Sequence, residues 1–140
     1  MITNDRQYKI TRLQAAKFRE GLAAVPSKGL PRAALKAMRE GAQSQLRELE
    51  EQIAEYETLR DGEVSSFAVD SIEGLGVALI KARIARKLTH KALAERMQMA
   101  EQQVQRDEAT FYEGASIRRL QEVANALNLR IHEVVTLEKE

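Results

Sequence analysis

The spacing of hydrophobic positions along the chain predicts helices. In the first part, apolar residues follow Ala15 at steps of three and four. Thr11 and Gln14 have the spacing of a capping box, in which Thr is the N-cap and Gln the third helical residue. We therefore expect a short amphipathic helix over about 12–24, ended by the turn-forming residues 26–29.

A second and much longer helix is expected to follow this turn. Pro31 suits the first position of a helix, and no strong helix breaker follows until Asp61-Gly62. Apolar residues recur along this stretch at a mean spacing of about 3.5, as in coiled coils. These apolar positions are Leu35, Met38, Ala42, Leu46, Leu49, Ile53 and Tyr56.

The later apolar positions of the long helix form a stripe that the first helix is too short to cover. In a hairpin, a helix over 12–24 would reach only the early part of the long one. The long helix is also basic over 32–39 and acidic over 55–61, against its own macrodipole. Two arrangements stay open: an antiparallel homodimer through this helix, or a hairpin within one chain whose stripe meets the C-terminal domain or another protein. The stripe consists of Leu46, Leu49, Ile53 and Tyr56.

The second half of the chain reads as a run of short helices. Residues 63–70 have neither a helical nor a strand period and are expected to be a linker. The predicted organisation is therefore an N-terminal helical hairpin over 1–62, this linker, and a C-terminal domain over 71–140. The helices expected in this domain are about 71–87, 91–96 after the cap Thr89, 101–108, 117–127 after the cap Ser116, and 131–137.

Composition and charge narrow the classes of function. The 140 residues contain no Cys and only two His, so no disulfide framework and no His-rich or Cys-based metal centre is expected. Aromatic residues make up 4% of the chain. The most abundant residue types are Ala, Leu, Glu, Arg and Gln, a composition that favours helix over strand. The net charge of +1 hides blocks of +6 over 1–40, −7 over 41–73 and +2 over 74–140. The basic run 81–91 holds no acidic residue, as in an anion-binding face.

Catalytic and membrane-spanning functions are not expected. The sequence shows no pair of a catalytic nucleophile and its base, no phosphate-binding loop, and no two carboxylates at the spacing of a catalytic site. No apolar run approaches the roughly 20 residues that span a bilayer, and the opening residues lack the apolar core of a secretory signal. We therefore expect a cytoplasmic all-α protein that is not an enzyme and needs no cofactor or metal.

The most specific pattern is that of a helix-turn-helix. Leu93 and Ala94 lie on the first helix, Met97 and Met99 flank the turn, and Val104 faces inward from the second helix. Ala94 has to be small because the second helix crosses it closely. Long polar side chains then face outward, where they can reach base edges in a major groove. These outward residues are Glu101, Gln102, Gln105 and Arg106.

Residues 75–134 resemble the lambda-repressor-like, Xre-type helix-turn-helix domain. The matching stretch is LGVALIKARIARKLTHKALAERMQMAEQQVQRDE, followed by a loop and SIRRLQEVANALNL. The resemblance implies a five-helix fold that binds double-stranded DNA, usually as a dimer on a palindromic operator. It also implies a partly buried salt bridge between Arg83 and Glu108 behind the recognition helix.

The resemblance assigns the DNA contacts to particular residues. Base contacts fall to the outward residues of the recognition helix, Glu101, Gln102, Gln105 and Arg106. Phosphate contacts fall to Thr89, His90, Lys91 and Gln103. This chain departs from the family pattern at three positions: Gln98 where Gly is usual in a left-handed turn, Ala100 where Ser or Thr caps the recognition helix, and Asp107 where an apolar residue is common.

A second, shorter resemblance concerns the opening residues ITNDRQYKITRLQ, which are similar to the start of some Xre-family regulators with an N-terminal helical extension. The resemblance implies that a protein of this size is often an antitoxin or a small prophage-type regulator. The expected partners are thus operator DNA, a second copy of the chain and, for an antitoxin, a cognate toxin protein. The alternative is a protein-interaction module whose N-terminal helices bind a partner and whose helix-turn-helix fold binds DNA weakly or not at all.

Overall fold

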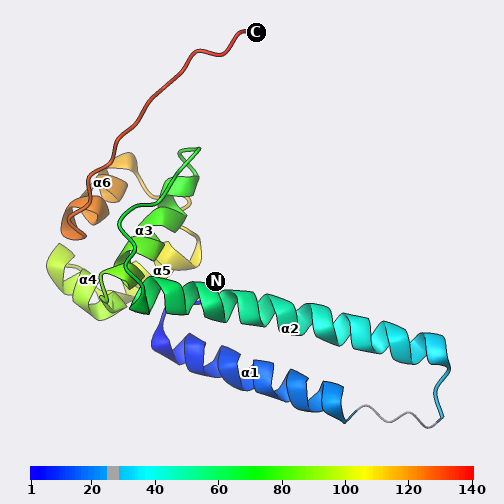
Figure 1. Cartoon of the computed structure of the whole chain (residues 1–140). Coiled ribbons are helices and arrows are strands. Elements are labelled where there is room, and N and C mark those ends of the chain that lie inside the picture. The colour runs from blue at the N-terminus through cyan, green and yellow to red at the C-terminus, as the bar shows by residue number, and fades with distance from the viewer. Residues whose placement is uncertain (25–28) are drawn as a thin grey trace. The chain divides into compact units, whose positions relative to one another are not determined.

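The protein is all-helical over the residues that the computed structural model describes, 1–24 and 29–140 (Figure 1). The predicted turn at 26–28 lies outside them. The described part of the chain contains no strand and divides into two compact units, Met1–Val64 and Ser65–Glu140. The all-α fold class is therefore confirmed. The helices are α1 Asp5–Ala23, α2 Arg32–Asp61, α3 Gly74–Ala85, α4 His90–Met97, α5 Glu101–Ala109 and α6 Ile117–Ala126.

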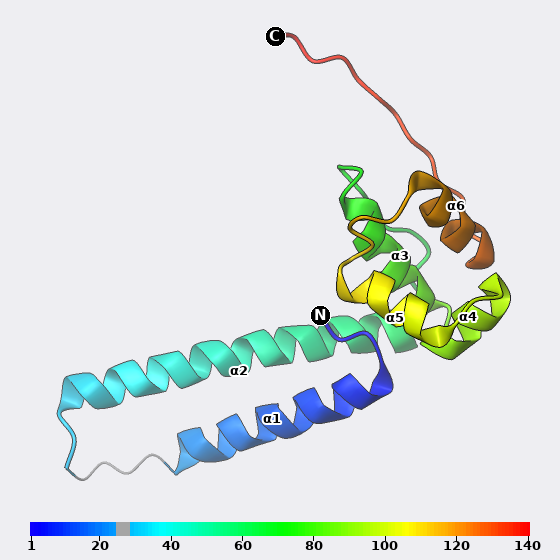
Figure 2. The ribbon, with the colours of Figure 1, turned by 180° about the vertical axis from the view of Figure 1, so that it is seen from behind.

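In the N-terminal unit, α1 and α2 lie side by side and antiparallel (Figures 1 and 2). The start predicted for α1 is wrong. The N-cap is Asn4, whose side chain accepts a hydrogen bond of 2.8 Å from the amide of Gln7. Thr11 lies inside the helix, and its hydroxyl donates to the carbonyl of Gln7 at 2.8 Å. Asn4 is followed by Asp5, whose charge favours a helix N-terminus, so the earlier cap wins.

The longer α1 changes which part of α2 is covered. Because the two helices are antiparallel, the start of α1 lies beside the end of α2. The rings of Tyr8 and Tyr56 are 5.2 Å apart, and the Tyr56 hydroxyl donates to Asp5 at 2.9 Å. The Tyr8 hydroxyl donates to Glu57, and the guanidinium of Arg60 lies 4.6 Å from the Tyr8 ring centre.

The prediction that the stripe Leu46, Leu49, Ile53 and Tyr56 lacks a partner within the hairpin is therefore wrong. Tyr56 is only 6% exposed, and the other three are partly buried. The expectation rested on an α1 that was too short. The uncovered part of the helix is its beginning, where residues 36–41 are exposed and Met38 is 56% exposed.

In the C-terminal unit, α4 packs against α5, and α6 packs against α3 and α4. The predicted caps are confirmed: Thr89 accepts from the amide of Ala92 at 3.0 Å, and Ser116 accepts from that of Arg119 at 3.1 Å. Ile117, the first residue of α6, is 78% exposed. The core of this unit consists of Leu79, Ile80, Ala82, Ile84, Leu93, Ala94, Val104, Tyr112, Val123, Ala124 and Leu127.

Two features hold the 110–116 loop and the end of α6 in place. At Gly76 of α3, an added Cβ would lie 1.9 Å from the carbonyl oxygen of Phe111, so only glycine permits the 110–116 loop to cross so closely. Two arginines bind the carbonyls at the end of α6, a favourable place for cations. Arg86 donates to Leu127 and Asn128 at 3.1 and 3.0 Å, and Arg96 donates to Ala126 at 3.1 Å.

The predicted fifth helix of this domain, 131–137, is not present. Asn128 adopts a left-handed conformation, with φ of 54°, and the amide of Leu129 donates to the carbonyl of Ala124, which ends α6. Residues 129–140 then form neither helix nor strand and are mostly exposed. Ile131, Val134, Val135 and Thr136 are β-branched, which disfavours helix, and the segment has no capping residue at its start. The unit therefore has four helices in place of the five expected.

We predict that Tyr56→Ala lowers the free energy of unfolding by about 3–5 kcal/mol, because it removes a buried ring together with its contact to Tyr8. Met38→Ala, on the exposed start of α2, is the matched control and should change it by less than about 0.5 kcal/mol. Urea denaturation followed by circular dichroism measures both. Equal effects of the two variants would contradict the packing described for the hairpin.

Candidate nucleic-acid interface

The turn between α4 and α5 has the geometry of a helix-turn-helix. Gln98 ends α4 in the left-handed region, with φ of 54° and ψ of 45°, and the amide of Met99 donates to the carbonyl of Ala94 at 3.0 Å. Ala94 is 3% exposed. Ala100 precedes α5 and supplies no side-chain cap. The turn is thus made by a non-glycine residue, at a cost of about 1 kcal/mol.

A buried cluster of three charged or polar side chains joins α3, α4 and α5. Arg83 donates through Nε to Glu108 at 2.6 Å and through Nη2 to the other carboxylate oxygen at 2.8 Å. Its Nη1 donates to the carbonyl of Leu88 at 2.7 Å. The Nε2 of His90 lies 3.0 Å from Glu108 and 3.1 Å from Arg83. Arg83, His90 and Glu108 are 2%, 7% and 4% exposed. A charge buried this deeply is costly unless an opposite charge is paired with it, so Arg83 and Glu108 each require the other.

The cluster sets the charge state of Glu108. Burial by itself would raise the pKa of this carboxyl, because a charge is poorly solvated inside the protein. Hydrogen bonds from His90 and Arg83, together with the positive charge of Arg83, outweigh burial and leave the pKa of Glu108 below its ordinary value of 4.5. The carboxylate therefore stays ionised and holds the end of α5 against α3.

The proposed phosphate contact of His90 is contradicted. Its ring lies inside this cluster and is 7% exposed, so it does not face a ligand outside the protein. The sequence placed His90 in the first turn of α4, which is correct, but the inward direction of the side chain depends on Arg83 of α3 and Glu108 of α5, which lie 7 and 18 residues away. Only the tertiary structure reveals its partners.

The outward face of α5 carries the residues expected to read bases. Glu101, Gln102, Gln105 and Arg106 are all exposed. The amide of Gln105 donates weakly to Glu101 at 3.4 Å. These side chains form a continuous polar surface on the helix that the buried cluster holds in place.

The other residues predicted to contact phosphate are Thr89, Lys91 and Gln103, and they differ in exposure and in their bonds within the protein. Lys91 is exposed at the start of α4, whereas the hydroxyl of Thr89 caps that helix. The amide of Gln103 donates to Asp107 at 3.0 Å, so its side chain is engaged within the protein. Asp107 also accepts from Arg119 of α6 at 3.0 Å. This ion pair was not foreseen, and it neutralises the acidic residue that departs from the family pattern.

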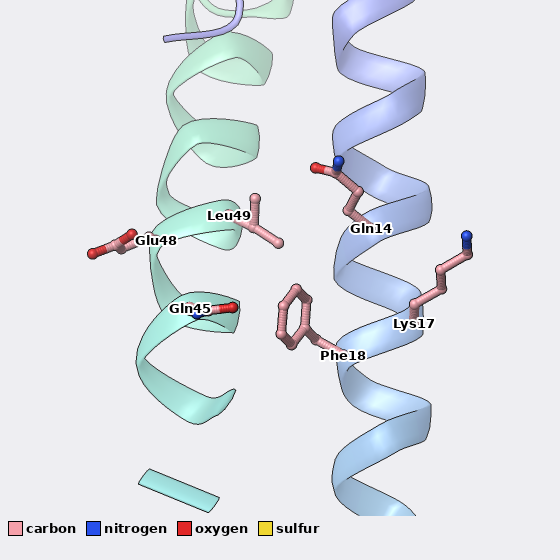
Figure 3. A pocket seen from close by; sticks show the side chains of 6 residues that line it. All are labelled: Gln14, Lys17, Phe18, Gln45, Glu48 and Leu49. Atoms are coloured by element: carbon pink, nitrogen blue, oxygen red, sulfur yellow. The ribbon is translucent and has the colours of Figure 1, made fainter. Parts of the chain in front are cut away.

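The N-terminal unit offers a second surface, a groove of about 400 Å³ between α1 and α2 (Figure 3). Phe18 of α1 and Leu49 of α2 both point into it. Its remaining lining is polar and comes from Gln14, Lys17, Gln45 and Glu48. The groove is open and mixed in character, unlike an enclosed catalytic pocket.

Comparison with known proteins adds one finding. Residues 78–140 match the family model of the Cro/C1-type HTH DNA-binding domain. The C-terminal part of the chain is a Cro/C1-type helix-turn-helix domain. This match confirms the Xre-type resemblance for these residues. No curated protein and no solved structure matches the chain.

Two further findings concern residues 1–24 and 29–140. Among them, no helix is long and apolar enough to cross a membrane. Nor do three or more acidic, His or Cys side chains come together there as a metal site would require.

We predict that Glu108→Gln lowers the free energy of unfolding by about 3–5 kcal/mol at neutral pH, because it leaves the buried charge of Arg83 unpaired. The pKa of Glu108 is lowered on folding, so its contribution is complete above its unfolded pKa and is lost as the pH falls below 4.5. The difference between the native chain and Glu108→Gln should therefore shrink on acidification.

Glu122→Gln is the matched control for this measurement. Its side chain is 55% exposed and lies 3.8 Å from Arg119, so it should cost less than about 1 kcal/mol. Denaturant titrations between pH 3 and pH 7 follow both variants. A Glu108→Gln effect as small as that of Glu122→Gln would show that the cluster does not hold α5.

We predict that Gln98→Gly stabilises the protein by about 0.5–1 kcal/mol, because glycine adopts the left-handed conformation without strain. Gln98→Ala keeps the strain and removes only the exposed side chain, so it should not stabilise. Thermal unfolding of the two variants separates relief of strain from loss of the side chain. Stabilisation by alanine equal to that by glycine would refute the strain.

Proposed function

We propose that the protein is a sequence-specific, repressor-type transcription regulator that binds its operator as a dimer. The observation that carries the proposal is the exposed polar face of α5 within a Cro/C1-type domain, held from behind by the buried pair Arg83–Glu108. A recognition helix has to be fixed in direction before its side chains can discriminate between bases. The buried pair supplies that rigidity where Ala100 supplies no cap.

Within this face, we assign base reading chiefly to Gln102 and Arg106, with Glu101 and Gln105 beside them. Arginine can donate two hydrogen bonds to a guanine, and glutamine can pair with an adenine. Each such contact gives about 1–3 kcal/mol of discrimination against a wrong base. Lys91, exposed at the start of α4, is the phosphate contact, which adds affinity without sequence preference.

Two considerations support the dimer: the resemblance to the Xre-type family, whose members usually bind DNA as dimers, and the geometry of DNA. A single recognition helix reaches only a few base pairs, so two copies on a palindrome are needed for a longer site. The two half-sites should lie about one helical turn apart, or a multiple of it. Release of counterions from the phosphates makes binding fall steeply as salt rises.

We predict that Arg106→Ala weakens binding to the operator by about 1–3 kcal/mol and relaxes the preference at one base position. Lys91→Ala should weaken binding to operator and scrambled DNA alike and reduce the salt slope by about one. Fluorescence anisotropy measures both, on a duplex selected by the protein from a randomised pool, at about 50 and 200 mM salt. Equal loss on every sequence for Arg106→Ala would refute base reading by this residue.

Arg39→Ala is the matched control, because it removes one exposed positive charge from α2 of the N-terminal unit. It should leave both the affinity and the salt slope nearly unchanged. Weak binding that is equal on selected and scrambled DNA would instead favour the alternative function, a module that binds a partner protein.

That second candidate is favoured by one observation, the groove between α1 and α2 beside the exposed start of α2. Phe18 and Leu49 give the groove an apolar floor that a helix of another protein can fill. In an antitoxin, this surface would bind the toxin while α5 binds DNA. Co-purification of the product of a neighbouring gene, lost on Phe18→Glu, tests this role directly.

A further inference from the structure

One half of the hairpin formed by α1 and α2 lacks a buried core. Within the described part of the N-terminal unit, buried residues occur only where the start of α1 meets the end of α2: Ile2, Tyr8, Thr11, Ala15, Tyr56 and Leu59. Over the described residues 16–24 and 29–55, none is buried. Apolar side chains in this stretch are only partly covered, among them Phe18, Leu22, Leu46, Leu49 and Ile53. An apolar helix face is stable only when another element covers it, so this half of the hairpin offers a surface to further helices.

The groove of Figure 3 lies in this half and has the composition of an interface between proteins. Its floor is apolar, because Phe18 of α1 and Leu49 of α2 point into it. Its two rims carry opposite charges, Lys17 on the α1 side and Glu48 on the α2 side. Both are exposed, and among the residues that the structure describes neither has an ion-pair partner. An apolar centre within a polar rim is the usual anatomy of an interface.

The charges of the two helices are opposite over the length that they share. Helix α1 has five basic and two acidic residues, a net charge of +3. The stretch 48–61 of α2 has six acidic residues and one basic, a net charge of −5. Within one hairpin, Arg19 binds Glu50 at 3.0 Å. This pair lies on the side away from the groove, because the two-residue step from Lys17 or Glu48 turns a helix by about 200°.

We propose that the groove of one chain binds the groove of a second copy of this chain, with the two-fold axis parallel to the helices, so that four helices form a bundle. In this arrangement, α1 of each copy lies over the acidic stretch of α2 of the other. Lys17 comes opposite Glu48 of the second copy at both rims, and the Phe18 and Leu49 side chains of both copies form a shared core. Each helix then has only antiparallel neighbours of opposite charge, as suits an up-and-down bundle.

The other two-fold arrangement through this face is less favourable. An axis across the helices would place α2 antiparallel to α2 of the second copy, one of the pairings that the sequence left open. Centred on the groove, it brings Lys17 close to Lys17 of the second copy, and Glu48 close to its Glu48, so like charges repel. It also directs the two ends of α2, at Asp61, to opposite ends of the bundle. The axis parallel to the helices brings both to one end, where the two C-terminal units are attached, as suits adjacent half-sites on DNA.

This inference rests on the proposed dimeric regulator and names the surface that forms the dimer. The surface lies in the N-terminal unit, outside the residues 78–140 that match the Cro/C1 family model. Helix α2 extends past the end of α1, so Met38 and Arg39 have no α1 opposite them in either copy and stay exposed in the bundle. The contact is therefore confined to the part of the hairpin where α1 and α2 lie side by side.

The test uses single-cysteine variants of the full chain, which has no cysteine of its own. Lys17→Cys and Glu48→Cys, carrying tags of different size, are mixed and treated with a short bismaleimide, because packed helices lie about 8–10 Å apart, farther than a disulfide spans. The mixed dimer linked from 17 to 48 should exceed both homodimers by at least about tenfold, since only this pair is held close together. Homodimers linked 17 to 17 and 48 to 48 would overturn the proposed axis, and no cross-linked dimer at all would overturn the bundle.

Glu50→Cys is the matched control for the cross-linking. It replaces an acidic residue of the same helix, two positions from Glu48, whose side chain binds Arg19 on the side away from the groove. Mixed with Lys17→Cys, it should yield at least about tenfold less mixed dimer than Glu48→Cys does. Equal yields would show that the cross-links arise from random collision and would contradict the proposal.

A charge exchange tests the rim contacts independently. Lys17→Glu places two acidic side chains opposite each other at both rims and should weaken self-association at least about threefold, measured by analytical ultracentrifugation. Adding Glu48→Lys restores opposite charges and should restore the dimer. Both side chains are exposed in the monomer, so the helical circular dichroism should not change. A double variant as monomeric as Lys17→Glu would contradict the pairing.

The outcomes for the bundle and for the proposed function are separable. Cross-linking is measured without DNA, and selective DNA binding is measured with the native chain. Cross-linking from 17 to 48 without selective binding would leave the bundle and remove the regulator. Selective binding as a dimer whose cysteine variants do not cross-link would leave the regulator and remove the bundle. A native chain that stays monomeric and binds another protein through Phe18 would assign the groove to that protein and overturn the inference.

Discussion

The buried ion pair between Arg83 and Glu108 is the interaction on which the DNA-binding unit depends. A lone charge inside the unit would cost several kcal/mol, so each partner requires the other. Arg83 comes from α3 and Glu108 from the end of α5, and His90 of α4 lies within hydrogen-bonding distance of both. The cluster thus joins three helices and fixes the position of α5 relative to α3 and α4.

This constraint compensates for weak local signals around the recognition helix. Gln98 adopts a left-handed conformation that glycine adopts more easily, and Ala100 offers no cap to α5. In isolation, a helix of 9 residues with such a start would hardly form. Here the buried contacts of Val104 and Glu108 hold it, and the ion pair between Asp107 and Arg119 ties it to α6. Tertiary contacts therefore supply what the local sequence lacks.

The parts of the fold that depend on local chemistry could be predicted from the sequence. Thr89 and Ser116 were identified as caps because a hydroxyl at that position bonds an amide three residues on. The long helix α2 lies between Pro31, because proline suits a helix start, and Gly62, because glycine disfavours a helix interior. The helix-turn-helix was recognisable because its apolar positions have a fixed spacing.

The parts that depend on distant contacts could not be predicted. The start of α1 follows Asn4 and not Thr11, in a hairpin where Tyr8 packs on Tyr56, which lies 48 residues away. The ring of His90 points inward, where its Nε2 lies within hydrogen-bonding distance of Arg83 and Glu108. The segment 131–137 has apolar residues at positions that a helix could use, yet no helix forms there. For α1 and His90 the stabilising neighbours lie on other helices, whereas 131–137 forms no helix because its own β-branched residues and its missing cap disfavour one.

The proposed function requires α5 to enter the major groove in two copies and to read bases there. Methylation protection of guanine N7 on the selected operator tests it most directly, because N7 lies in the major groove. The expected result is protected guanines in two clusters about one helical turn apart, with the protection in each cluster lost on Arg106→Ala. Bound DNA without any protected guanine, in operators that contain G·C pairs, would contradict it.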